Sequence, residues 1–362
     1  MAIENLIENV DSQIVNIRTR SLDVSFNELY DMYQNKELII SPDYQRMFRW
    51  EPEKQSRFIE SLILEMPVPP IFVIEIKDGE YELIDGLQRI SSYLRFRGEK
   101  LENDEQEPLI LCGCDIVPEL NNLSFELMPK ALQIKIKRSF VRMEVIRKES
   151  EPSLKYHMFK RLNTGGELLS AQEIRNCTVR LLGSKGIDFL EKCSENKDFR
   201  TIVSRIGNER ERLQYRQELV LRYLAMKNDL DSYKYPVTEY LTNYLEDITT
   251  GEREFNCDKE WDIFCKTSRF FAEKFGKDAF SGKTKNEIYK KEFVLYYFDG
   301  MFVSVAKMID SLSACEDLSK LVDKLNEIKF GEELKFYNTG SVNGVKTRIK
   351  IFTEGVQEIL DS

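Results

Sequence analysis

Apolar residues in the first half of the chain follow two different spacings, that of a helix and that of a strand. Ser25 and Glu28 form the S-x-x-E pattern that caps a helix, and apolar residues recur at helical spacing after it. In Phe140–Ile146 apolar and charged residues alternate, as they do in a half-buried strand. The predicted elements are a helix after Ser25, a strand at 38–40, a helix from Pro52, strands at 71–76 and 81–84, a helix at 87–97 and a strand at 140–146.

From about Ser170 onward the spacing is helical nearly throughout. Ser170 and Glu173 form a second capping pattern, and apolar residues recur at helical spacing after them. The helices predicted further along the chain span residues 210–228, 237–247, 261–275, 287–312 and 315–328. The chain is therefore expected to be α+β, with an α/β domain at residues 1–165 followed by an α-helical accessory domain at residues 166–362.

Composition excludes several classes of protein. The 362 residues include 53 Lys and Arg against 62 Asp and Glu, and 42% hydrophobic residues are enough to build folded cores. No stretch approaches the roughly 20 apolar residues of a membrane span. The start of the chain is acidic and polar, unlike a secretory signal, so a cytoplasmic protein is expected. The seven irregularly spaced cysteines are expected to be reduced thiols.

The chain has a single histidine, His157, inside a helix predicted at 152–161. One imidazole cannot build a zinc-binding histidine cluster, an H-E-x-x-H motif or a His-Asn-His nuclease site. The structural interpretation of His157 is a polar residue on a helix face.

The string E-L-I-D-G-L-Q-R at 82–89 places an acid at the end of a strand, then a glycine turn, then a helix. The first turn of a helix presents backbone N–H groups and a partial positive charge, which suit a phosphate. Arg89 would add a guanidinium fork, Asp85 a ligand for a divalent metal, and Gln88 an amide to position water. The alternative is structural, with Asp85 as a helix cap and Arg89 as a surface base.

Two further strings combine residue types that suit a nucleotide. S-P-D-Y-Q-R at 41–46 holds an aromatic ring, an amide and a guanidinium, and F-K-R-L-N-T-G-G at 159–166 is followed by L-S-A-Q-E-I-R-N. The structural alternative places the aromatic rings in the core and uses the glycines to end a helix. The candidate nucleotide-binding residues in these strings are Tyr44, Gln45, Arg46, Arg161, Asn163, Arg175 and Asn176.

Taken together and in this order, the strings resemble those of one family. P-x-Y-Q-R-x-x-x-W, P-V-P-x-I, D-G-x-Q-R and F-x-R-L-N-x-G-G-x-x-L-S-x-x-E-I-R-N are similar to the motifs of the GmrSD-type restriction-endonuclease N-terminal domain, from about residue 22 to residue 182. The resemblance implies a ParB/sulfiredoxin-like fold for this part of the chain. Leu87 departs from the pattern, because the family's string has a glutamine there.

The resemblance also implies a function. Asp85, Gln88 and Arg89 would be the catalytic residues of nucleoside-triphosphate hydrolysis, with Gly86 in the phosphate-binding turn and Mg²⁺ on Asp85. The protein would be a hydrolysing module of a prokaryotic phage-defence or modification-dependent restriction system. The alternative is a sensor of nucleotide or DNA that regulates a partner nuclease without hydrolysis. The candidate partners are a nucleoside triphosphate, double-stranded DNA, a partner nuclease and a second copy of the chain.

Charge is unevenly distributed along the sequence. Residues 130–148 carry seven bases against one acid, although the chain as a whole has a net charge of −9. Basic residues gathered on one face would follow the phosphates of DNA. The alternative is that they pair with neighbouring acids. The DNA-binding candidates in this stretch are Lys135, Lys137, Arg138 and Arg142.

Overall fold

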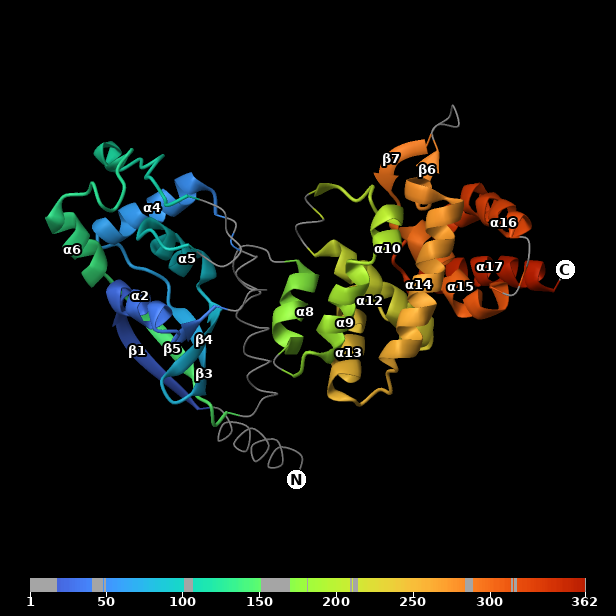
Figure 1. Cartoon of the computed structure of the whole chain (residues 1–362), viewed down its shortest axis with the longest axis horizontal. Helices are drawn as coiled ribbons and strands as arrows, with labels where there is room; N and C mark the ends of the chain where they lie inside the picture. Colours follow the sequence, from blue (N-terminus) through green and yellow to red (C-terminus); the bar gives the residue numbers. More distant parts are fainter. Residues whose placement is uncertain are drawn as a thin grey trace, which may run out of the picture. The chain divides into compact units, whose positions relative to one another are not determined.

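The computed structural model describes residues 18–40, 48, 50–100, 107–150, 170–180, 182–208, 210, 214–283, 289–313, 315 and 318–361. The chain divides into two compact units, Met1–Leu169 and Ser170–Ser362, and each is described by itself. The first unit contains a mixed sheet with helices, and the second is mainly helical (Figure 1). The α+β class expected from the sequence is confirmed. None of the helices within the described ranges is both long and apolar enough for a membrane span.

The first unit is built on a five-stranded sheet with the strand order β1-β5-β3-β4-β2. The β1–β5 and β3–β4 pairs are antiparallel, whereas the β5–β3 and β4–β2 pairs are parallel. The strands are β1 (Thr19–Ser25), β2 (Leu38–Ile39), β3 (Ile71–Lys77), β4 (Glu80–Asp85) and β5 (Phe140–Ile146). This order places the end of β4 beside the beginning of β3.

One face of the sheet is apolar because its buried residues are in register. Val145 of β5 lies opposite Val73 of β3, which in turn lies opposite Leu83 of β4, and all three are buried. Arg142 of β5 alternates with this set and is exposed. A shift of one residue would move the apolar set to the exposed face, so burial specifies the register.

Helices cover the apolar face and complete the core of the first unit. Phe26 lies with its ring centroid 5.9 Å from that of Phe58 and 5.0 Å from that of Tyr93. The hydroxyl of Ser25 accepts the N–H of Glu28 at 3.1 Å, which confirms the predicted cap. The helices are α2 (Phe26–Gln34), α4 (Pro52–Ile63), α5 (Leu87–Phe96) and α6 (Lys130–Arg138).

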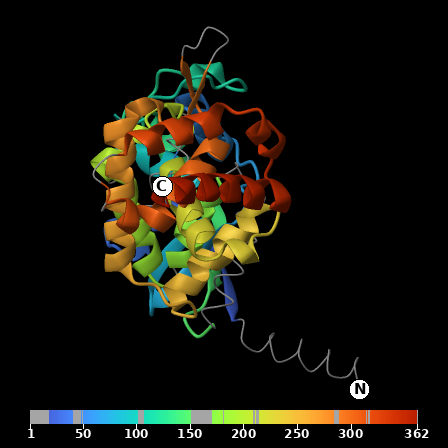
Figure 2. The ribbon, with the colours of Figure 1, turned by 90° about the vertical axis from the view of Figure 1, so that its right-hand side faces the viewer.

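The second unit consists of helices and one small hairpin in the part that the structure describes. Its helices are α8 (Ala171–Arg180), α9 (Lys185–Ser194), α10 (Lys197–Ile202), α12 (Tyr215–Asn228), α13 (Val237–Thr250), α14 (Cys257–Lys274), α15 (Leu295–Leu312), α16 (Ser319–Phe330) and α17 (Val342–Leu360). The hairpin pairs β6 (Ser281–Lys283) with β7 (Tyr289–Phe293). Figure 2 views this unit from the side on which the red helix α17 runs across the near face.

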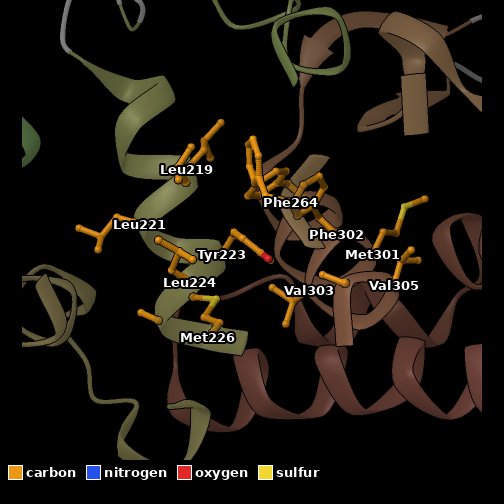
Figure 3. Packing of buried hydrophobic residues seen from close by; sticks show 14 of the residues in the cluster. Leu219, Leu221, Tyr223, Leu224, Met226, Phe264, Met301, Phe302, Val303 and Val305 are labelled. Atoms are coloured by element: carbon orange, nitrogen blue, oxygen red, sulfur yellow. The ribbon is translucent and has the colours of Figure 1, made fainter. Parts of the chain in front are cut away.

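The core of the second unit is aromatic at its centre. Tyr223 of α12, Phe264 of α14 and Phe302 of α15 form a triangle with centroid distances of 5.0, 5.7 and 5.9 Å (Figure 3). Tyr223 points from α12 toward α15 in this view. Aromatic pairs at such distances add to the free energy of burial, so this cluster joins three helices that are far apart in sequence.

The prediction of a helix at 287–312 is wrong for the first part of that range. Tyr289–Phe293 forms β7, and the helix α15 begins only at Leu295. Phe293 is buried against Phe280, with ring centroids 6.0 Å apart, and the N–H of Val294 donates to the carbonyl of Phe280 at 2.8 Å. The strand partner lies upstream in sequence, so helical periodicity alone could not reveal it. The helices predicted at 210–228 and 315–328 also begin later, at Tyr215 and Ser319.

A buried ion triad joins three helices of the second unit. Asp299 of α15 is fully buried and accepts hydrogen bonds at 2.7 Å from the guanidinium groups of both Arg222 and Arg348. Burial alone would raise the pKa of Asp299, but the two guanidinium groups outweigh it and hold the pKa below its ordinary value. The carboxylate therefore stays charged and is the shared counter-charge of two buried cations.

We expect Asp299→Asn to destabilise the protein by about 3–5 kcal/mol, because it leaves two buried guanidinium groups without a counter-charge. Urea unfolding would measure the change. Asp310→Asn is the matched control, since the side chain of Asp310 is 66% exposed in its pair with Lys266 and its loss should cost less than about 1 kcal/mol. Equal costs for the two variants would contradict the argument.

Lys329 of α16 is another buried cation, with 1% of the residue exposed. Its ammonium group donates to the carbonyls of Asp278 at 3.1 Å and Ala279 at 2.8 Å. Burial lowers the pKa of Lys329 to about 7, against the opposing effect of Asp278 and with a further lowering by Lys283.

This pKa gives a testable dependence of stability on pH. Between about pH 7 and the ordinary lysine pKa of about 10.4, the unfolded chain binds more protons at Lys329 than the folded chain does. Stability should therefore rise with pH in this window, by at most about 1.4 kcal/mol per pH unit from this group. This contribution to the pH dependence of stability should be absent in Lys329→Met. It should remain in Lys350→Met, because the side chain of Lys350 is exposed and Lys329 is unchanged. Urea midpoints across the window would measure it, and parallel profiles for wild type and Lys329→Met would refute it.

Candidate functional site

The candidate site lies where the backbone turns sharply from the end of β4 into α5. Asp85 ends the strand, Gly86 adopts φ 106° and ψ 8°, and Leu87 begins α5. A Cβ atom on Gly86 would lie 2.5 Å from Cγ2 of the fully buried Ile71. Both the positive φ and the contact with Ile71 require glycine here. The result is a helix N-terminus set against the start of β3, where backbone N–H groups and the helix dipole favour an anion.

Arg89 lies in the first turn of α5 and is held on two sides. One Nη2 atom donates to the carbonyl of Pro70 at 3.0 Å and to Oδ2 of Asp85 at 3.2 Å. The side chain of Arg89 is 17% exposed, and its Nε atom is buried without a hydrogen-bond partner among the described residues. The guanidinium is therefore positioned by the turn and retains an unsatisfied donor.

Asp85 is more accessible than its partner, with 36% of its side chain exposed. Its ion pair with Arg89 spans one helical turn, and such a partly exposed pair contributes little to stability. An incoming anion could compete for Arg89, which would leave the Asp85 carboxylate available to a cation or to water. The geometry thus brings the predicted residues Asp85, Gly86 and Arg89 together in one turn.

Gln88 makes a contact that its spacing in the sequence did not indicate. Its Oε1 atom accepts the backbone N–H of Trp50 at 3.1 Å. The carbonyl of Trp50 in turn accepts the amide of the fully buried Gln55 at 2.5 Å. The sequence analysis did not single out Gln55, and only its position five residues after Trp50 could have suggested it.

Five of the predicted nucleotide-binding residues lie outside the described residues. These residues are Tyr44, Gln45, Arg46, Arg161 and Asn163. His157 also lies outside them. The roles predicted for the five residues remain predictions.

Arg175 and Asn176 lie in α8, at the beginning of the second unit, and are 2% and 3% exposed. Arg175 donates to Thr242 at 3.1 Å and to Gln172 at 2.7 Å. Asn176 donates to Gln217 at 2.5 Å. These side chains join α8 to α12 and α13 in a buried polar network, and their predicted contact with a nucleotide stays a prediction. The predicted cap of α8 is confirmed by reciprocal hydrogen bonds between Ser170 and Glu173.

The basic residues predicted to bind DNA lie on α6 and β5. Lys135 pairs with Glu65 at 3.2 Å, and Arg142 pairs with Asp23 at 3.1 Å. Burial, followed by the charge of Arg97, lowers the pKa of Lys137. Lys135, Arg138 and Arg142 line an open groove of about 870 Å³ together with the exposed apolar residues Met66, Ile134 and Phe140. The groove is therefore lined by both partly neutralised basic side chains and exposed apolar side chains.

Within the described ranges, no group of three or more His, Cys, Asp or Glu side chains could hold a metal ion. Of the residues that the structure describes, Asp85 offers an accessible carboxylate at the candidate site. Mg²⁺ commonly binds through one or two carboxylates plus substrate phosphates and water. The donor set therefore fits a magnesium ion that arrives with phosphates and does not fit a metal cage made of protein ligands alone.

The fold and the site define a class: a mixed α+β domain with a strand, a left-handed glycine and a helix N-terminus arranged to receive an anion. Residues 26–180 match the family model described as GmrSD restriction endonuclease, N-terminal domain. The match confirms the resemblance that the motifs indicated for this part of the chain, and it points to a component of a GmrSD-type restriction system. No curated protein and no solved structure matches the chain, so the ParB-like fold remains a prediction.

The matched region does not coincide with the first compact unit. It begins at Phe26 and continues to Arg180, which is the last residue of α8. The matched segment therefore leaves out β1 of the first unit's sheet and includes the first helix of the helical unit. The buried network of Arg175 and Asn176 holds this last part of the segment within the helices that follow.

We expect Gly86→Ala to lower the free energy of unfolding by about 1–3 kcal/mol, because it adds backbone strain and a contact with Ile71. Gly79→Ala is the matched control, since Gly79 has φ +81° but no atom within 4 Å of an added Cβ. Chemical denaturation measures the free energy of unfolding of both variants. The cost of Gly79→Ala gives the backbone strain alone, and the additional cost of Gly86→Ala gives the steric overlap with Ile71. If Gly79→Ala cost as much as Gly86→Ala, the contact with Ile71 would not explain the glycine.

Proposed function

We propose that the first unit binds and hydrolyses a nucleoside triphosphate as part of a DNA restriction system. The observation that carries the proposal is the turn at Gly86, which sets a helix N-terminus, Asp85 and Arg89 side by side within the GmrSD N-terminal family segment. A polyphosphate suits this arrangement because it can accept backbone N–H groups and a guanidinium fork at the same time.

Each residue has a role that follows from its position. The first turn of α5 binds phosphate oxygens, and Arg89, held by the carbonyl of Pro70, neutralises charge that develops on the phosphoryl group. Asp85 binds the magnesium ion that accompanies the nucleotide or orients the attacking water. Mg²⁺ would supply charge neutralisation at the phosphates.

The alternative is a sensor that binds nucleotide or DNA and regulates a partner nuclease without hydrolysis. The pairing of Asp85 with Arg89 favours it, because a carboxylate engaged in an ion pair is less available to a metal ion or to water. Both functions predict nucleotide binding at the same turn, and they differ in turnover. Double-stranded DNA, a partner nuclease and a second copy of the chain are the proposed partners in either case.

The test is phosphate release from ATP, GTP, CTP and UTP with Mg²⁺, measured with and without duplex DNA. We expect Asp85→Asn and Arg89→Ala each to reduce turnover by roughly 100-fold, since each removes a group that stabilises the transition state. Thermal unfolding would establish that both variants remain folded.

Asp262→Asn is the matched control, because Asp262 also pairs with a cation one helical turn away but lies in α14. It should leave turnover unchanged. Unchanged turnover in Asp85→Asn and Arg89→Ala would overturn the hydrolase proposal. Saturable nucleotide binding without phosphate release would establish the sensor.

A further inference from the structure

The side chain of Gln88 contacts a distant part of the chain. Its carboxamide oxygen accepts the backbone N–H of Trp50, which lies 38 positions earlier in the sequence. This contact joins the glutamine of the D-G-x-Q-R string to the tryptophan that ends the P-x-Y-Q-R-x-x-x-W string.

The main chain of Trp50 is held on its other side as well. Its carbonyl accepts the amide of Gln55, and the carboxamide oxygen of Gln55 accepts Nη1 of Arg95 at 3.1 Å. Arg95 of α5 is itself anchored, since its Nε donates to the carbonyl of Glu107 at 2.9 Å. Hydrogen bonds to buried polar groups are costly to break, so this chain of contacts fixes Trp50 relative to α5.

The indole ring of Trp50 has packing partners, but its N–H group has no hydrogen-bond acceptor among the described residues. Its ring centroid lies 5.9 Å from that of Phe58, and the ammonium of Lys54 lies 4.9 Å from it. Its Nε1 atom is buried and has no hydrogen-bond partner among the described residues. Gln88 therefore holds in place a residue with an unused donor, next to the first turn of α5.

We propose that Gln88 is a positioning residue of the nucleotide site: it fixes Trp50 against the N-terminus of α5 and does not orient the attacking water. The inference rests on the proposed function and refines it. It separates Asp85 and Arg89, which touch nucleotide, from Gln88, which shapes the site through Trp50. A water-orienting glutamine would affect the chemical step, whereas a positioning glutamine affects the affinity for nucleotide.

Trp50 itself supplies the readout. The chain has two tryptophans, and Trp261 lies in α14 of the second unit, so Trp261→Phe leaves Trp50 as the sole tryptophan whose emission is followed. In this parent, Gln88→Met removes the acceptor at nearly constant volume, and Gln88→Glu keeps an acceptor oxygen. Emission and acrylamide quenching of Trp50 are measured without nucleotide, and affinity and turnover are then measured with ATP, GTP, CTP and UTP.

We expect Gln88→Met to shift the Trp50 emission to the red, to increase quenching and to weaken nucleotide binding by roughly fivefold, with kcat at saturation nearly unchanged. Gln88→Glu should restore the emission of the parent. A fall in kcat with unchanged emission and affinity would overturn the inference. If the parent binds no nucleotide, the proposed function fails, and the emission of Gln88→Met still decides whether Gln88 holds Trp50.

Discussion

The close approach of Gly86 to Ile71 is the constraint on which the candidate site depends. Ile71 opens β3 and is fully buried, and β4 runs antiparallel beside it, so the end of β4 must pass directly over this side chain. With no Cβ, Gly86 can pass Ile71 and turn into α5 at once. Because the turn is so short, Arg89 in the first turn of α5 donates hydrogen bonds both to the carboxylate of Asp85 at the end of β4 and to the carbonyl of Pro70.

Two buried polar assemblies play different physical roles in the two units. In the first unit, the contacts from Gln88 through Trp50 and Gln55 to Arg95 connect elements that surround the site. In the second unit, the Asp299 carboxylate pairs with two guanidinium groups and joins three helices. The first assembly ends next to an accessible carboxylate, and the second is enclosed on all sides.

The helix α8 connects the family segment to the rest of the chain. Its Arg175 and Asn176 come from a string that looked suited to a nucleotide, yet their side chains are satisfied within the helical unit. A buried guanidinium with several acceptors is well suited to fixing one helix on its neighbours.

The sequence by itself determined the elements whose signals are local. The cap at Ser25, the alternation in Phe140–Ile146 and the strand, glycine and helix around Gly86 all follow from short-range chemistry, and the structure agrees with them. Motif order also indicated a family resemblance, which the match over residues 26–180 confirms. Tertiary structure decided what depends on distant partners: β7 became a strand because β6 pairs with it, and Gln88 found Trp50. Periodicity records which face of a segment is buried but carries no information about which distant group will meet it.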